Sequence, residues 1–116
     1  MALSLALVAA IIALHLYLDV YGLFSTGGDR RIEMHHNERT SKHLMSFRYI
    51  PERFEGLLVG ASTSGNLKPG LVGGDGLYNA SINGGNITET RIIAENAIRR
   101  GDIRYVIICL DPALTA

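Results

Sequence analysis

The chain has no tryptophan, a single cysteine and no net charge. Its 116 residues contain 11 Lys and Arg against 11 Asp and Glu. This balance gives no electrostatic argument for a nucleic-acid partner, because such proteins usually carry a basic patch or stripe. Cys109 cannot form an intrachain disulfide, and its place in the apolar run YVIICL indicates a small buried hydrophobic residue. Once its N-terminal segment is subtracted, the chain is long enough for one domain at most.

Charge is also missing from the N-terminal stretch Ala2–Leu18. The run lies near the lower limit for a bilayer-spanning helix, about 17 residues, and extension to Phe24 carries it past about 20. Tyr17, Tyr21 and Phe24 cluster at one end, as aromatic residues do at lipid headgroups. A secretory signal peptide would need a positive start and a small-residue cleavage site, and a buried soluble helix is rarely apolar all round. We therefore expect a transmembrane anchor over residues 1–24.

A polar segment of mixed charge separates this run from the rest of the chain. We expect residues 25–50 to form a linker, in which residues 41–49 make a short helix or an extended arm over the folded unit. Four side chains could in principle bind a metal: Glu33, His35, His36 and His43. No pair has the spacing that places ligands on one face, so the sequence predicts no metal site and no cofactor. Pro51 marks the expected start of the folded unit.

Residues 51–116 show the succession of strand, crossover, strand, helix and strand that is typical of a parallel α/β sheet. The expected strands lie at residues 53–59, 77–82 and 104–110. A helix is expected after Asn86, because Asn86 and Glu89 form a capping-box pattern and Gly101 closes the segment. Three strands are few for such a sheet, and the last would lie at an edge with an apolar face uncovered. We therefore expect the chain to hold the N-terminal part of a larger domain.

Small polar residues follow each of the predicted strands. Ligands of an open parallel sheet bind outside the carboxyl ends of the strands, so residues 62–66, residues 83–86 and Asp111 are expected to converge. Ser62 follows the first strand and is well placed as a nucleophile, while the nearby glycines let backbone N–H groups approach an oxyanion. The same turn also fits an ordinary loop with local hydrogen bonds. It matches neither the G-x-S-x-G elbow of α/β-hydrolases nor a phosphate-binding loop.

Four blocks of the sequence are together similar to membrane-anchored members of the SGNH (GDSL-type) hydrolase superfamily: YLDVYGLF, RYIPERFEGLLVGASTSGN, YNASINGGN and RYVIICLDP. The resemblance covers most of the chain. It implies a flavodoxin-like three-layer α/β/α sandwich, and esterase or acyl-transfer activity on O-acyl groups. The expected substrate is an acylated component of the cell envelope. The expected protein is single-pass, bound to the lipid bilayer, with its C-terminal part on the extracytoplasmic side.

The resemblance also assigns roles to single residues. Ser62 matches the nucleophile and donates its own N–H to the oxyanion, and Gly84 or Gly85 matches the second donor. Asp111 stands where the family has an asparagine donor. The Asp-x-x-His of the family has no counterpart, since all four histidines precede Ser62. A serine hydroxyl without a base is a poor nucleophile, so we expect the chain by itself to be inactive or nearly so.

Two alternatives stay open. The first is a non-catalytic protein, a small membrane-anchored subunit that packs its uncovered sheet against a protein partner. The second concerns orientation in the membrane. Four basic residues follow the apolar run: Arg30, Arg31, Arg39 and Lys42. The positive-inside rule would place the C-terminal part in the cytoplasm, and basic residues upstream of the run would reverse that orientation.

Overall fold

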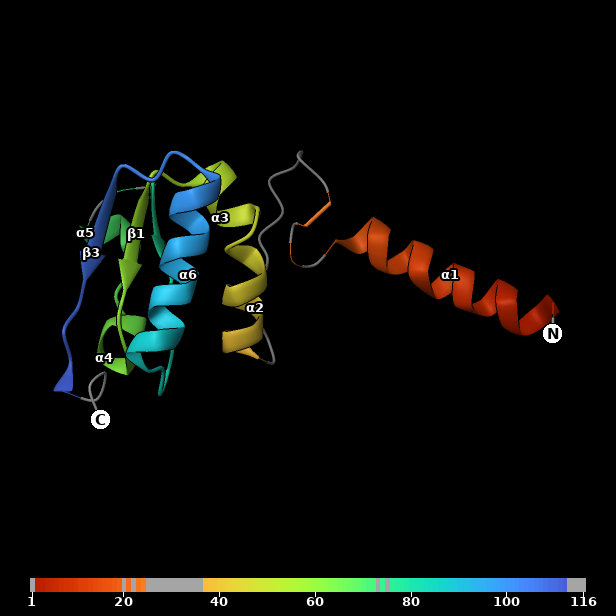
Figure 1. Cartoon of the computed structure of the whole chain (residues 1–116), viewed down its shortest axis with the longest axis horizontal. Coiled ribbons are helices and arrows are strands. Elements are labelled where there is room, and N and C mark those ends of the chain that lie inside the picture. Colours follow the sequence, from red (N-terminus) through yellow and green to blue (C-terminus); the bar gives the residue numbers. More distant parts are fainter. Residues whose placement is uncertain are drawn as a thin grey trace.

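The computed structural model describes residues 2–19, 21, 23–24, 37–72, 74 and 76–112. Helices precede the first strand, and further helices separate the strands from one another along the chain (Figure 1). They are α1 (Ala2–Leu18), α2 (Glu38–Met45), α3 (Tyr49–Arg53), β1 (Gly56–Val59), α4 (Ser62–Gly65), α5 (Pro69–Val72), β2 (Leu77–Asn79), α6 (Ile87–Arg100) and β3 (Tyr105–Ile108). This order confirms the predicted α/β class.

The strands form one parallel sheet in the order β2-β1-β3. The central strand β1 pairs with both neighbours, so that Leu57 lies opposite Tyr78 on one side and Val106 on the other. All four residues of β1 are buried. A strand that is covered on both faces favours a continuous apolar run, which explains the sequence of β1. The predicted three-stranded parallel sheet is confirmed, with strands shorter than expected.

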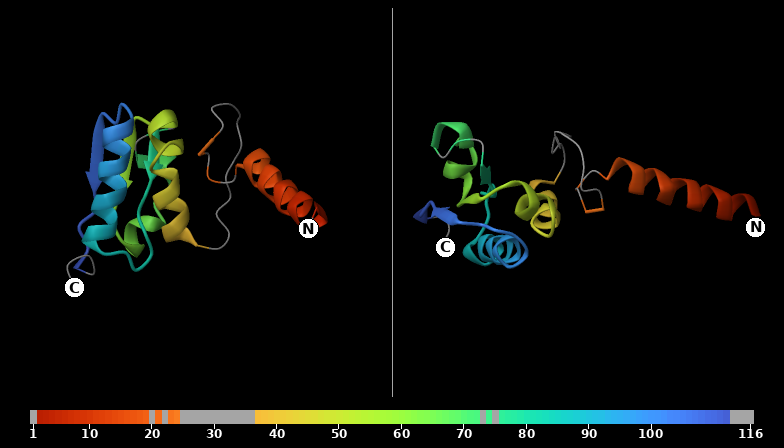
Figure 2. Two further views of the ribbon diagram at one scale, coloured as in Figure 1. Left: turned by 45° about the vertical axis from the view of Figure 1, so that its right-hand side comes forward. Right: turned by 90° about the horizontal axis from the view of Figure 1, so that it is seen from above.

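Helices lie on both sides of this sheet. Seen from above, α6 lies on one side and the short helices α4 and α5 lie on the other (Figure 2). Both α2 and α3 contact α6, and α6 contacts β1. The core cluster gathers side chains from α2, α3, β1, α6 and the loop after β2: Met45, Ile50, Leu57, Val59, Ala80, Ile82, Ile93 and Ala97.

Helix α6 begins after Asn86 and ends before Gly101, as the sequence predicts. The Asn86 side chain accepts a hydrogen bond from Glu89 N (3.0 Å), and Glu89 Oε2 accepts one from Asn86 N (3.1 Å), which completes the capping box. Gly101 ends the helix in an extended conformation. A Cβ atom on Gly101 would collide with the backbone of Pro51. Glycine is therefore required there by the close approach of α3 rather than by a left-handed turn.

The packed unit begins before the boundary that was predicted at Pro51. Met45 and Ile50 are buried members of the core, although they lie in the segment predicted as a linker. The expected short helix over the folded unit is α2, and α3 follows it. Pro51 lies in the first turn of α3, where a backbone N–H would have no intrahelical partner, so proline is tolerated there and marks no boundary.

Helix α1 points away from the sheet (Figure 1). Its described side chains are exposed along its length. It ends at Leu18, and Asp19 then adopts a positive φ of 37°. The Asp19 carboxylate accepts hydrogen bonds from Leu23 N (2.8 Å) and Phe24 N (3.1 Å), which folds the chain back in a turn. No helix within the described ranges is long and apolar enough to cross a membrane. The predicted transmembrane anchor over residues 1–24 is therefore not found.

Candidate functional site

The three loops at the carboxyl edge of the sheet lie together. Thr63 Oγ1, just after β1, donates a hydrogen bond to Asp111 Oδ2, just after β3, at 2.7 Å. On the other side, Ile82 N donates to Gly60 O at 3.1 Å, which joins the loop after β2 to the end of β1. The parallel arrangement of the strands thus brings the loops to one edge, as the sequence predicts.

Ser62 is exposed at the start of α4, two residues beyond the buried Gly60. The neighbouring Ser64 points inward, and its Oγ donates to Ala61 O at 2.9 Å. A Cβ atom on Gly60 would collide with Ser64 Oγ. The two serines therefore have different roles, since Ser64 closes the turn whereas Ser62 presents its side chain to solvent.

Asn79 at the end of β2 holds this turn from the side. Its Nδ2 donates to Ser64 O (2.8 Å) and Leu67 O (2.9 Å), and its Oδ1 accepts from Ser81 N (3.0 Å). Asn79 was predicted to lie inside a strand, and this role was not predicted. Asparagine is depleted in strands, so its presence in LYNASI was a signal that the strand ends there.

The two glycines predicted as oxyanion donors are not equivalent. Gly84 has a φ of +61°, a left-handed conformation that favours glycine, and its carbonyl accepts a hydrogen bond from Arg39. The N–H of Gly85 donates to Ile82 O at 3.0 Å. Because the Gly85 N–H is used inside its own loop, Gly84 is the better candidate of the pair.

Asp111 accepts the hydrogen bond from Thr63 through its carboxylate. An ionised carboxylate has no proton to donate. In this state it differs from the asparagine that the resemblance places here, because it adds negative charge near Ser62. Gly85 and Asp111 are thus the weaker candidates among the predicted oxyanion residues, while Ser62 and Gly84 stay predictions.

The described histidines do not provide a base beside Ser62. His15 lies in α1, with its Nδ1 2.9 Å from Ile11 O. The His43 ring packs edge-on against Phe47, with 5.2 Å between ring centroids. His35 and His36 lie outside the described residues, as does Glu33. Within the described part of the chain, no group of acidic, histidine or cysteine side chains could hold a metal ion.

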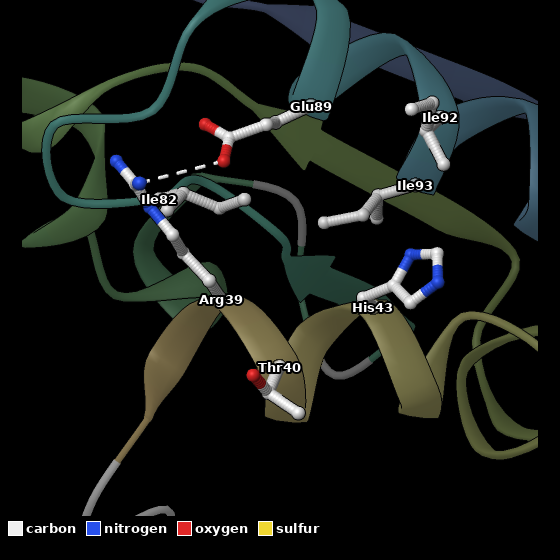
Figure 3. A pocket seen from close by; sticks show the side chains of 7 residues that line it. All are labelled: Arg39, Thr40, His43, Ile82, Glu89, Ile92 and Ile93. Atoms are coloured by element: carbon white, nitrogen blue, oxygen red, sulfur yellow. Dashed lines mark ion pairs between the residues drawn. The ribbon is translucent and has the colours of Figure 1, made fainter.

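His43 instead faces an open cavity of about 270 Å³ between α2 and α6 (Figure 3). Its lining residues are Arg39, Thr40, His43, Ile82, Glu89, Ile92 and Ile93. At one end of this cavity, the Arg39 guanidinium and the Glu89 carboxylate form an ion pair at 3.5 Å. The isoleucines make its floor apolar, while the charged pair closes one end.

Comparison of the chain with protein-family models, with curated proteins and with solved structures finds no match.

Proposed function

We propose that this chain carries the nucleophile and part of the oxyanion hole of a serine acyl-transfer site. The observation that carries the proposal is the exposed Ser62 hydroxyl, which follows a buried central strand at the edge where three loops meet. A nucleophile at this place can meet a substrate outside the sheet while its backbone stays rigid. The resemblance to SGNH hydrolases, with their flavodoxin-like three-layer sandwich, supports the same assignment.

The proposed reaction is hydrolysis of an ester or transfer of an O-acyl group. Ser62 Oγ attacks the acyl carbonyl carbon, and its proton passes to a general base. The N–H groups of Ser62 and Gly84 donate to the oxyanion that forms. The alcohol leaves with a proton, and water or an acceptor hydroxyl then attacks the acyl-serine and releases Ser62. The general base is supplied by a partner, because the described histidines lie away from Ser62.

The proposed substrate is an acylated component of the cell envelope, and the proposed anchor is α1. Its exposed side chains include Leu5, Ile11 and Leu16, none of which is covered by the sheet or its helices. Such a helix gains free energy when its apolar surface enters lipid. Attachment of α1 to a bilayer would therefore keep Ser62 close to envelope substrates.

Chemical rescue by an external base tests this assignment. The full chain, in mild non-ionic detergent, is treated with a fluorophosphonate, and the phosphonylated residue is identified by mass spectrometry. Without added base we expect almost no adduct, because the Ser62 hydroxyl has no general base. Imidazole should accelerate the reaction at Ser62 in proportion to its unprotonated concentration.

Ser64 provides the matched control in the same turn. The Ser64→Ala variant should keep the imidazole-dependent adduct, whereas Ser62→Ala should lose it. An adduct that forms equally on Ser62 and on exposed serines or threonines elsewhere would contradict the proposal, because it would show no activation by the site. Rapid labelling of Ser62 without imidazole would contradict the expectation that the described chain lacks the base.

The uncovered side of the sheet favours a second candidate function, that of a non-catalytic subunit. Ile108 is 58% exposed on β3, and Leu110 just beyond it is 85% exposed. An apolar groove of about 370 Å³ runs between β3 and α6. Exposed apolar surface of this kind marks protein interfaces. A partner that copurifies in fixed stoichiometry, and that Ile108→Lys releases, would support this function, while a chain that purifies alone would contradict it.

A further inference from the structure

The side chain of Lys42 is buried, with 5% of its surface exposed. A buried ammonium group is costly unless it is paired and hydrogen-bonded. Here Lys42 Nζ donates to Glu38 Oε1, one helical turn earlier on α2, at 2.7 Å. It also donates to the carbonyl of Ser81, 39 residues further along the chain. The lysine is therefore directed into the loop that follows β2.

Two neighbours of Lys42 on α2 reach the same loop. Glu38 Oε2 accepts a hydrogen bond from Asn83 N at 3.1 Å. Arg39 donates to the carbonyl of Gly84 while it also pairs with Glu89. Three side chains of one short helix thus bind backbone groups at positions 81, 83 and 84.

This arrangement differs from an ordinary surface ion pair. Arg91 and Glu95 on α6 have the same spacing and the same 2.7 Å separation, but 73% and 42% of their side-chain surfaces are exposed. Among the described residues, no backbone group of another loop takes part in that pair. Exposed pairs of this kind contribute little to stability. Glu38 and Lys42 differ because each also holds the 81–84 backbone.

The loop held by α2 is connected to the turn that carries Ser62. Ser81 N donates to Asn79 Oδ1, and Asn79 Nδ2 donates to Ser64 O and Leu67 O. Ile82 N donates to Gly60 O. A continuous set of hydrogen bonds thus runs from α2, through the loop after β2, to the turn after β1.

We propose that Glu38 and Lys42 are positioning residues, which fix the 81–84 loop so that the Gly84 N–H keeps its place beside the Ser62 turn. Their purpose in acyl transfer rests on the proposed function. Their hold on the loop rests on the contacts alone. A donor that is already fixed needs no reorganisation when the oxyanion forms, so a loop of this kind benefits from a rigid clamp.

Amide hydrogen exchange of the full chain in detergent tests the clamp. Glu38→Gln keeps the shape of the side chain and removes its charge, and Lys42→Met keeps most of the apolar stem. Each variant should accelerate exchange at Asn83, Gly84 and Gly85 by about tenfold or more, because a hydrogen bond to a charged group is lost. Exchange at Leu57 and Ile93 in the core should accelerate much less than exchange in the loop, because core amides follow only the change in global stability.

The matched controls are Glu95→Gln and Arg91→Met, which break the exposed pair on α6 and should leave loop exchange as it is. Unchanged loop exchange in the Glu38 and Lys42 variants would overturn the clamp. Acceleration of equal size in the loop and in the core would also overturn it, because the pair would then act on global stability alone.

Imidazole-dependent phosphonylation of Ser62 provides the second readout, compared at equal folded fraction. We expect the Glu38 and Lys42 variants to react about tenfold more slowly than the wild type. A loop that loosens while Ser62 reacts at the wild-type rate would overturn the positioning role. Absence of Ser62 labelling in the wild type would instead overturn the proposed function, and hydrogen exchange would still decide whether the clamp exists.

Discussion

The two outer strands of the sheet have very different surroundings. Leu77 on β2 is 1% exposed, and the loop after β2 is held by α2, by Asn79 and by the end of β1. Ile108 on β3 is 58% exposed, and the segment after β3 is joined to the Ser62 turn by the exposed bond between Thr63 and Asp111.

This difference indicates which part of the site is complete. On the β2 side, Glu38, Lys42 and Asn79 are hydrogen-bonded to backbone groups and hold the loop with Gly84, while the buried Ser81 Oγ has no hydrogen-bond partner among the described residues. On the β3 side, apolar side chains face solvent, which is the kind of surface that another chain or segment covers. The base of the proposed acyl-transfer site is therefore best sought on the side of β3.

The largest expected effect comes from truncating one side chain on each outer strand. Leu77→Ala should lower the free energy of unfolding by about 2–5 kcal/mol, because it removes buried apolar contacts and leaves a cavity. Ile108→Ala should change it by less than about 0.5 kcal/mol, because the side chain is already in contact with solvent. Urea unfolding of the full chain in mild detergent measures both. Equal losses would mean that β3 is covered as fully as β2.

A smaller effect is expected from the polar links on the two sides of the Ser62 turn. Asn79→Ala should cost about 1–3 kcal/mol, because the partly buried Ser64 carbonyl and the Ser81 N–H lose their partner. Thr63→Val keeps the side-chain shape and should cost about 0.5–1.5 kcal/mol or less, since water can replace the exposed bond to Asp111. The same unfolding measurement applies, and a larger cost for Thr63→Val would reverse the comparison.

The smallest expected effect is the dependence of stability on the pH. Partial burial would by itself raise the pKa of Glu38, but hydrogen bonds from Lys42 and Asn83 and the charge of Lys42 outweigh it and lower the pKa below 4.5. A carboxyl group with a lowered pKa in the folded state stabilises the protein above the unfolded value. That contribution disappears as the pH falls through the lowered pKa.

Unfolding of the wild type and of Glu38→Gln at a series of pH values measures this contribution. The wild type should be the more stable of the two at neutral pH, and the difference should vanish in acid. The groups around Glu38 are Lys42 on its own helix, Arg39 beside it, Tyr78 on β2 and the Asn83 N–H. Glu95→Gln is the control, and salt should remove its smaller effect more readily because the Arg91–Glu95 pair is exposed. A difference that grows in acid would have the wrong sign.

Several elements could be predicted because their causes are local. The apolar run of β1 indicated a strand buried on both faces, and the Asn86–Glu89 pattern indicated the start of α6. The parallel sheet followed from the order of strands and helix. Ser62, placed directly after a strand, was expected at the carboxyl edge of the sheet, and the structure places it there.

Other features could not be predicted because their partners are distant in the sequence. Lys42 and Ser81 are 39 residues apart, and Thr63 and Asp111 are 48 apart. A lysine in a polar segment has the same local pattern whether it is solvated or buried. For this reason residues 25–50 were predicted to be a linker, although Met45 and Ile50 belong to the core.

Features with local causes were determined by the sequence itself, whereas features that depend on distant partners were decided by the tertiary structure. Hydrophobic periodicity and capping act within a few residues, so they were sufficient for the α/β class and for the exposed position of Ser62. Which side of the Ser62 turn is held, and which is left open, depends on contacts between segments brought together by the sheet. Burial of Lys42, together with the backbone groups that Glu38 and Asn79 bind, makes these polar residues the support of a loop, because most buried polar groups in proteins are hydrogen-bonded.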